Sequence, residues 1–170
     1  MSISFLPRLI TDELTDLTPE LLQRQGIRLL MMDFDNTIVP YTTNVPTEKM
    51  EAWLRMMVQS DIRLCVVSNS KKDRVRVFCG KYGIPVITHA NKPGTRGIEK
   101  CLAQFGIDRK EAAIVGDQIF TDTLGGNSAG ISTILVKAID NHNFWLKARH
   151  VLELPFIFSA RKRRINHEES

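Results

Sequence analysis

The stretch LLMMDFDNTIVP, Leu29 to Pro40, joins an unbroken apolar run to two aspartates, Asp33 and Asp35, that follow directly where the run ends. A short apolar run bounded by polar and turn residues is typical of a strand that is buried on both faces. The stretch therefore predicts a central strand with two carboxylates at its carboxyl end.

Four further segments have the same character, and helical patterns separate them. The five predicted strands cover residues 27–34, 62–68, 84–89, 112–117 and 132–137. Between them, apolar residues recur at helical spacing over 46–60, 72–83 and 94–106, and Gly83 and Gly106 are expected to end the last two helices. Strands that alternate with helices predict an α/β fold, with a mostly parallel five-stranded sheet and helices on both faces.

Length and composition suit one domain over residues 1–170, with a basic tail at about 159–170. No apolar run is long enough to span a membrane, and the N-terminus lacks the pattern of a secretory signal, so we expect a cytoplasmic protein.

Three cysteines without CxxC spacing are expected to be buried reduced thiols. The four cations at 161–164 fit a solvated tail, an anionic membrane contact or a nucleic-acid contact.

Polar side chains gather at the predicted strand ends. In a parallel sheet, ligands bind beyond the carboxyl ends of the strands, so these side chains should face one crevice. The candidates are four carboxylates, a hydroxyl and an ammonium: Asp33, Asp35, Asp117, Asp122, Ser68 and Lys92. Because close carboxylates repel one another, a hard divalent cation such as Mg²⁺ is the expected partner.

This set of groups predicts phosphoryl transfer. Asp33 would attack phosphorus, and Asp35 would protonate the leaving alcohol and then activate water. Ser68 and Lys92 would neutralise the phosphoryl oxygens, and Asp117 would hold the metal. Asp122 is left with two alternatives, since it could bind the metal through water or orient Lys92.

The segments DFDNTIVP and GDQIFTD, with Ser68 and Lys92 between them, resemble the four motifs of the haloacid-dehalogenase (HAD) phosphatases. The resemblance implies a three-layer Rossmann-like fold and Mg²⁺-dependent hydrolysis. It implies that Asp33 is nucleophile and metal ligand, that Asp35 is acid/base and a metal ligand through its carbonyl, and that Asp117 is a metal ligand. It further implies phosphate binding by Ser68, Asn69 and Lys92, with Thr37 and Asp122 in support.

The motif spacing leaves no room for an inserted cap domain, which other HAD enzymes close over small substrates. An open site suits proteins, nucleic acids or lipids. A finer resemblance, in the N-terminal FLPRLI, in ANKP and in GDQIFTDTLGGNSAG, is to the YqeG-type subclass IIIA phosphatases, relatives of the phosphatidylglycerophosphate (PGP) phosphatases. It implies dephosphorylation of PGP, a step in phosphatidylglycerol and cardiolipin synthesis.

Apolar residues beside cations near both ends fit a peripheral contact with the inner face of a membrane, or simple packing on the domain; the C-terminal ones are Phe144, Trp145, Leu146, Phe156 and Phe158. The competing substrates are a phosphoprotein, a nucleic-acid end or a nucleotide. Two non-enzymatic alternatives are a receiver-type phospho-acceptor, which the presence of Asp35 disfavours, and an RNA-binding assembly factor. We do not expect a nucleic-acid partner. The sequence does not indicate the oligomeric state.

Overall fold

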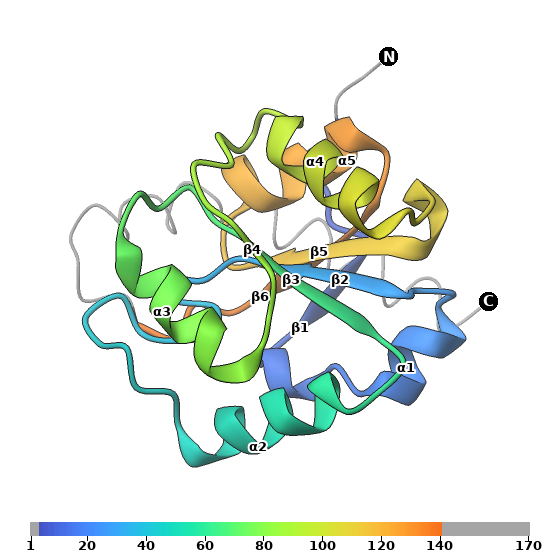
Figure 1. The fold of residues 1–170 in the computed structure, drawn as a ribbon. Helices are drawn as coiled ribbons and strands as arrows, with labels where there is room; N and C mark the ends of the chain where they lie inside the picture. The colour runs from blue at the N-terminus through green and yellow to red at the C-terminus, as the bar shows by residue number, and fades with distance from the viewer. Residues whose placement is uncertain (1–3, 141–170) are drawn as a thin grey trace.

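One parallel sheet organises the chain. In the computed structural model, which describes residues 4–140, six strands lie in the order β1-β6-β5-β2-β3-β4 (Figure 1). Their bounds are β1 Leu9–Thr11, β2 Leu29–Met32, β3 Arg63–Val67, β4 Val86–Ile87, β5 Ala112–Gly116 and β6 Ser132–Val136. All five neighbouring pairs are parallel, which confirms the predicted α/β class.

The prediction of five strands is wrong by one. The additional strand, β1, has three residues and pairs with β6 at the edge of the sheet, with Leu9 opposite Ile134. Three residues are too few for a recognisable periodicity, and an edge strand lacks the continuous apolar run of a central one. The five predicted strands are all present.

Helices cover both faces of the sheet. Their bounds are α1 Pro19–Arg24, α2 Glu48–Val58, α3 Asp73–Tyr82, α4 Arg96–Phe105 and α5 Leu124–Ala129, with short turns at Leu14–Asp16 and Arg109–Glu111 and a π-helix at Ile119–Thr123. Figure 1 shows α4 and α5 on one side of the sheet and α1, α2 and α3 on the other. Each set packs on its own apolar cluster.

Glycines end the predicted helices as expected. Gly83 and Gly106 follow α3 and α4 with φ of +66° and +60°, a left-handed conformation that residues with a Cβ rarely adopt. At its start, α2 is capped by the hydroxyl of Thr47, which accepts a hydrogen bond from the Met50 amide. These local signals mark where the helices begin and end.

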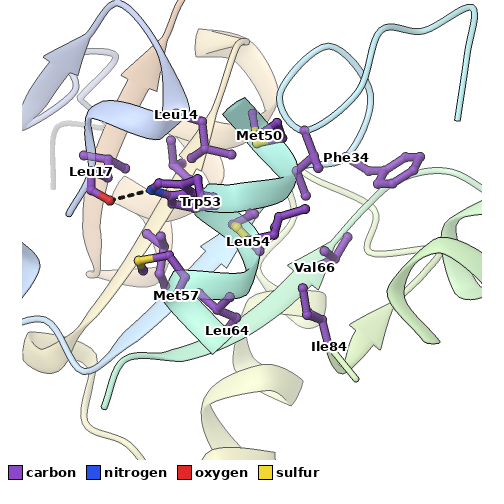
Figure 2. Close-up of a cluster of buried hydrophobic side chains, with 14 of the residues drawn as sticks. Leu14, Leu17, Phe34, Met50, Trp53, Leu54, Met57, Leu64, Val66 and Ile84 are labelled. Carbon is purple, nitrogen blue, oxygen red and sulfur yellow. Dashed lines mark hydrogen bonds between the residues drawn. The ribbon is translucent and has the colours of Figure 1, made fainter. Parts of the chain in front are cut away.

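The larger core cluster centres on α2. Trp53 is 4% exposed, and its indole Nε1 donates a 2.8 Å hydrogen bond to the carbonyl oxygen of Leu17 (Figure 2). Leu54 and Met57 are fully buried beside it. The hydrogen bond lets a large aromatic side chain be buried without leaving its N–H unpaired, and it ties α2 to the N-terminal segment.

Cys65, Cys79 and Cys101 are buried and form no disulfide, which agrees with the predicted buried thiols. Among residues 4–140, no helix is long and apolar enough to cross a membrane. The basic tail and the apolar residues near the C-terminus lie outside the described residues.

Candidate active site

Three neighbouring strands bring predicted site residues together where the strands end, at the carboxyl end of the sheet. β2 lies between β3 and β5, with Met32 opposite both Val66 and Val115. Asp33 and Asp117 directly follow β2 and β5, and Ser68 directly follows β3. The parallel register therefore places these three side chains at adjacent strand ends, as the sequence predicted.

Lys92 joins two of the carboxylates. Its Nζ lies 3.0 Å from Asp33 Oδ1 and 2.6 Å from Asp122 Oδ1. The side chains of Lys92 and Asp122 are each only 1% exposed. Of the two roles considered for Asp122, the structure therefore contains the contact that orients Lys92.

The charges of this group depend on one another. Burial opposes the charge on Lys92, but the carboxylates of Asp122 and Asp33 outweigh this effect and raise the pKa of the Lys92 ammonium. Burial raises the pKa of Asp122 to about 7, against the attraction of Lys92, which lowers it. The Lys92 ammonium therefore stays charged between the two carboxylates.

Asp33, Asp117 and Asp122 form an acidic cluster in which one carboxylate oxygen of each lies within 4.8 Å of the others. Thr37 Oγ1 donates a 3.4 Å hydrogen bond to Asp117 Oδ1 and so orients that carboxylate. Lys92 sets one positive charge against the three carboxylates, and an all-oxygen donor set that stays acidic in this way suits a hard divalent cation. The donor set thus fits the predicted magnesium site.

The position of Lys92 is set by Asn69. The Asn69 side chain accepts a 2.7 Å hydrogen bond from the Lys92 amide and donates a 2.8 Å bond to the Lys92 carbonyl oxygen. His89 and Asn91, just before Lys92, both have positive φ, and the Lys92–Pro93 peptide is cis. Asn69, predicted as a phosphate ligand, thus uses its side-chain oxygen and one of its two amide N–H groups to hold this loop.

Ser68 is 2% exposed, and its Oγ accepts a 3.0 Å hydrogen bond from the Ser70 amide. The hydroxyl proton of Ser68 is still available to a ligand, because that bond uses only an oxygen lone pair. Binding of phosphate by Ser68 and Asn69 stays a prediction.

Two residues at the site were not singled out from the sequence, Gly116 and Arg74. At Gly116, a Cβ would collide with the carboxylate of Asp122, which packs directly over this position. The π-helix that carries Asp122 folds back over the end of β5, and the Gln118 amide donates a 3.3 Å bond to Asp122 Oδ2. The sequence feature that could have identified Gly116 is the Gly-Asp pair at the start of GDQIFTD.

Arg74 lies in the first turn of α3 and forms an ion pair with the carboxylate of Asp35. Its guanidinium also reaches residues 40–45, which we call the rim loop, by hydrogen bonds to the Thr43 carbonyl oxygen and to Asn44 Oδ1. The sequence showed Arg74 only as a polar position of a helix, and no local pattern signals a contact with Asp35.

Known proteins that are similar to this chain include several phosphatases. A family model described as mitochondrial PGP phosphatase matches residues 2–140. The chain is 33% identical over 132 residues to the probable phosphatase YqeG of Bacillus subtilis, covering 78% of this chain and 77% of that protein. It is 31% identical over 139 residues to the mitochondrial phosphatidylglycerophosphatase GEP4 of Saccharomyces cerevisiae, covering 73% of each.

Solved structures support the fold. The cobalt-bound deoxy-D-mannose-octulosonate 8-phosphate phosphatase YrbI of Haemophilus influenzae superposes with a TM-score of 0.53, over 74% of this chain and 75% of that one, at 15% identity. At this identity the likeness speaks for the fold alone. Together with the sequence relatives, it confirms the HAD-type α/β fold that the four motifs predicted.

Proposed function

This chain belongs to the mitochondrial PGP phosphatase family, and we propose that it removes the terminal phosphate of phosphatidylglycerophosphate through a phosphoenzyme formed on Asp33. The protein is a HAD-type phosphatase. The observation that carries the proposed mechanism is the contact of the buried Lys92 with Asp33, beside the acidic cluster.

In the first half of the reaction, a carboxylate oxygen of Asp33 would form a bond to phosphorus while the bond from phosphorus to the glycerol oxygen breaks. Asp35 would give its proton to that oxygen, so that the alcohol leaves neutral. Lys92 would balance negative charge on the phosphoryl oxygens, and Ser68 would donate a hydrogen bond to one of them.

In the second half, water would attack phosphorus and the bond to Asp33 would break. Asp35 would take the proton from the water, which returns the acid/base to its starting form. Inorganic phosphate leaves, and the protons and bonds balance over Asp33, Asp35, the substrate and the attacking water.

Asp33 and Asp117, with the carbonyl of Asp35, would hold Mg²⁺, and Asp122 would support the site through Lys92. A bound Mg²⁺ would supply positive charge to the phosphoryl oxygens and lessen the repulsion among the carboxylates. We expect chelation with EDTA to abolish phosphate release and added Mg²⁺ to restore it, while Ca²⁺, which prefers a larger and less regular ligand shell, restores less. Activity that is unaffected by EDTA would contradict the magnesium site.

The choice of PGP as substrate is supported by the activity for which the yeast relative is named and by the access to the site. The one helix between β2 and β3 is α2, and the one helix between β3 and β4 is α3, so no inserted domain covers the strand ends there. We propose that this open edge approaches the headgroup of a lipid at the inner face of a membrane, with the protein on the cytoplasmic side.

Substrate selectivity tests the proposal. Mg²⁺-dependent phosphate release would be measured with PGP in mixed micelles, beside glycerol phosphate, a nucleotide and a phosphopeptide, with Asp33→Asn as the blank. The proposal expects the lipid to give the highest kcat/KM and the blank to give no release. Preference for the nucleotide or phosphopeptide would reject PGP and leave the phosphatase chemistry in place.

A further inference from the structure

Arg74 makes several contacts at the edge of the active site. Its side chain is 15% exposed, and that of Asp35 is 23% exposed. One end of the guanidinium pairs with Asp35, and the other donates to the Thr43 carbonyl oxygen at 3.1 Å and to Asn44 Oδ1 at 2.7 Å. Arg74 therefore connects the expected acid/base to the rim loop.

Aromatic rings enclose the same guanidinium. Its central carbon lies 5.2 Å from the ring centroid of Phe34 and 5.9 Å from that of Tyr41, distances at which a cation is attracted to an aromatic face. Phe34 stands between the two catalytic aspartates in the sequence and is fully buried. A planar, many-donor cation is held by two rings and at both ends, which few side chains other than arginine could achieve.

We propose that Arg74 is a positioning residue, which fixes the Asp35 carboxylate for proton transfer and ties it to the rim loop. The proposal rests on the proposed function of Asp35 as acid/base. The contact lies across a gap of 39 positions in the chain, so only the packing of the start of α3 beside the rim loop creates it (Figure 1). A carboxylate on a turn after a strand has free side-chain rotation unless such a contact restricts it.

Kinetics with p-nitrophenyl phosphate separate positioning of Asp35 from general damage to the site. The nitrophenolate leaving group needs no proton, so its release in the first half-reaction does not need Asp35, whereas hydrolysis of the phosphoenzyme does. In Arg74→Met we expect a burst of nitrophenolate close to the enzyme concentration, followed by steady-state turnover that is about tenfold or more slower than wild type. We expect the burst rate to stay within about twofold of the wild-type phosphorylation rate, because Asp33 and Lys92 are untouched.

Two variants serve as comparisons. Arg76→Met removes the same charge from the same helix, at an exposed arginine whose contact is with Thr88, and should leave both phases unchanged. Arg74→Lys keeps the charge but cannot reach Asp35 and the rim loop together, and should fall between wild type and Arg74→Met.

A second readout does not depend on activity. Tyr41 is already 43% exposed, so its cleavage is limited by how freely the rim-loop backbone can enter a protease site. Release of the loop should therefore let chymotrypsin cleave after Tyr41 several-fold faster in Arg74→Met than in Arg76→Met, at equal thermal stability. Equal cleavage in both variants, or an equal loss of burst and steady-state rates in Arg74→Met, would overturn the proposal. Absence of nitrophenolate release by the wild-type protein would instead count against the proposed function, and the cleavage result would still decide whether Arg74 holds the loop.

Discussion

At Gly116, a hydrogen atom stands where other residues have a Cβ, and this decides where the Asp122 carboxylate lies. Asp122 in turn pairs with Lys92 at 2.6 Å, and Lys92 reaches Asp33. Gly116, which has no side chain, thus sets the position of Lys92, the cation that contacts the expected nucleophile Asp33.

Substitution Gly116→Ala should lower kcat about a hundredfold, since a shift of about 1 Å in such a site has an effect of this size. The change displaces Asp122 and with it Lys92, so the loss should appear with lipid and aryl phosphates alike. Steady-state kinetics on a folded, purified variant would measure it.

Gly80→Ala is the matched control. Gly80 lies in α3, and a Cβ there meets nothing within 4 Å. Because alanine is the better helix former, this variant should keep full activity and be slightly more stable. Wild-type activity in Gly116→Ala would show that Asp122 has no part in placing Lys92.

Among the elements, α2 is attached to the N-terminal segment by a buried hydrogen bond from Trp53. Trp53→Phe removes the indole N–H and leaves the Leu17 carbonyl oxygen without its partner. We expect the free energy of unfolding to fall by about 1–3 kcal/mol, the usual effect of leaving one buried polar group unpaired. Urea denaturation would measure the change.

Met56→Ala serves as control on the same helix, because Met56 is 42% exposed. Its effect should stay within about 0.5 kcal/mol. Equal destabilisation by the two substitutions would mean that the Trp53 hydrogen bond contributes nothing specific to the attachment of α2.

Prediction from the sequence succeeded where the signal was local or repeated. The apolar runs indicated β2 to β6, and the parallel order expected of alternating strands and helices placed Asp33, Ser68 and Asp117 at one edge of the sheet. Prediction failed for β1, which is too short to show a pattern. It also missed Arg74, because the contact with Asp35 depends on how the rim loop packs against α3, and no spacing in the chain encodes that.

At the scale of the whole molecule, the buried thiol of Cys79 makes the free energy of unfolding depend on pH. Burial, and to a lesser extent the nearby Cys65, raise the pKa of Cys79 to about 12, from the ordinary 9.0. Above pH 9 the unfolded chain would lose the Cys79 proton while the folded protein keeps it. The unfolded state then binds fewer protons, so the free energy of unfolding falls as pH rises from about 9 to 12.

The comparison of wild type with Cys79→Ala isolates this contribution from other titrating groups. Between pH 9 and 11 the wild type should lose stability more steeply than the variant, by up to about 1.4 kcal/mol per pH unit. Urea unfolding at a series of pH values gives both slopes. Parallel slopes would mean that the Cys79 thiol titrates equally in the folded and unfolded states.

The proposed PGP phosphatase activity depends on a phosphoenzyme at Asp33, and trapping that species tests it most directly. The protein would be quenched during turnover of PGP, reduced with borohydride, which converts an acyl phosphate to an alcohol, and mapped by mass spectrometry. We expect reduction at position 33 alone, in the presence of Mg²⁺ and PGP together, and none in Asp33→Asn. Phosphate release from PGP without modification at Asp33, or with modification at another carboxylate, would contradict it.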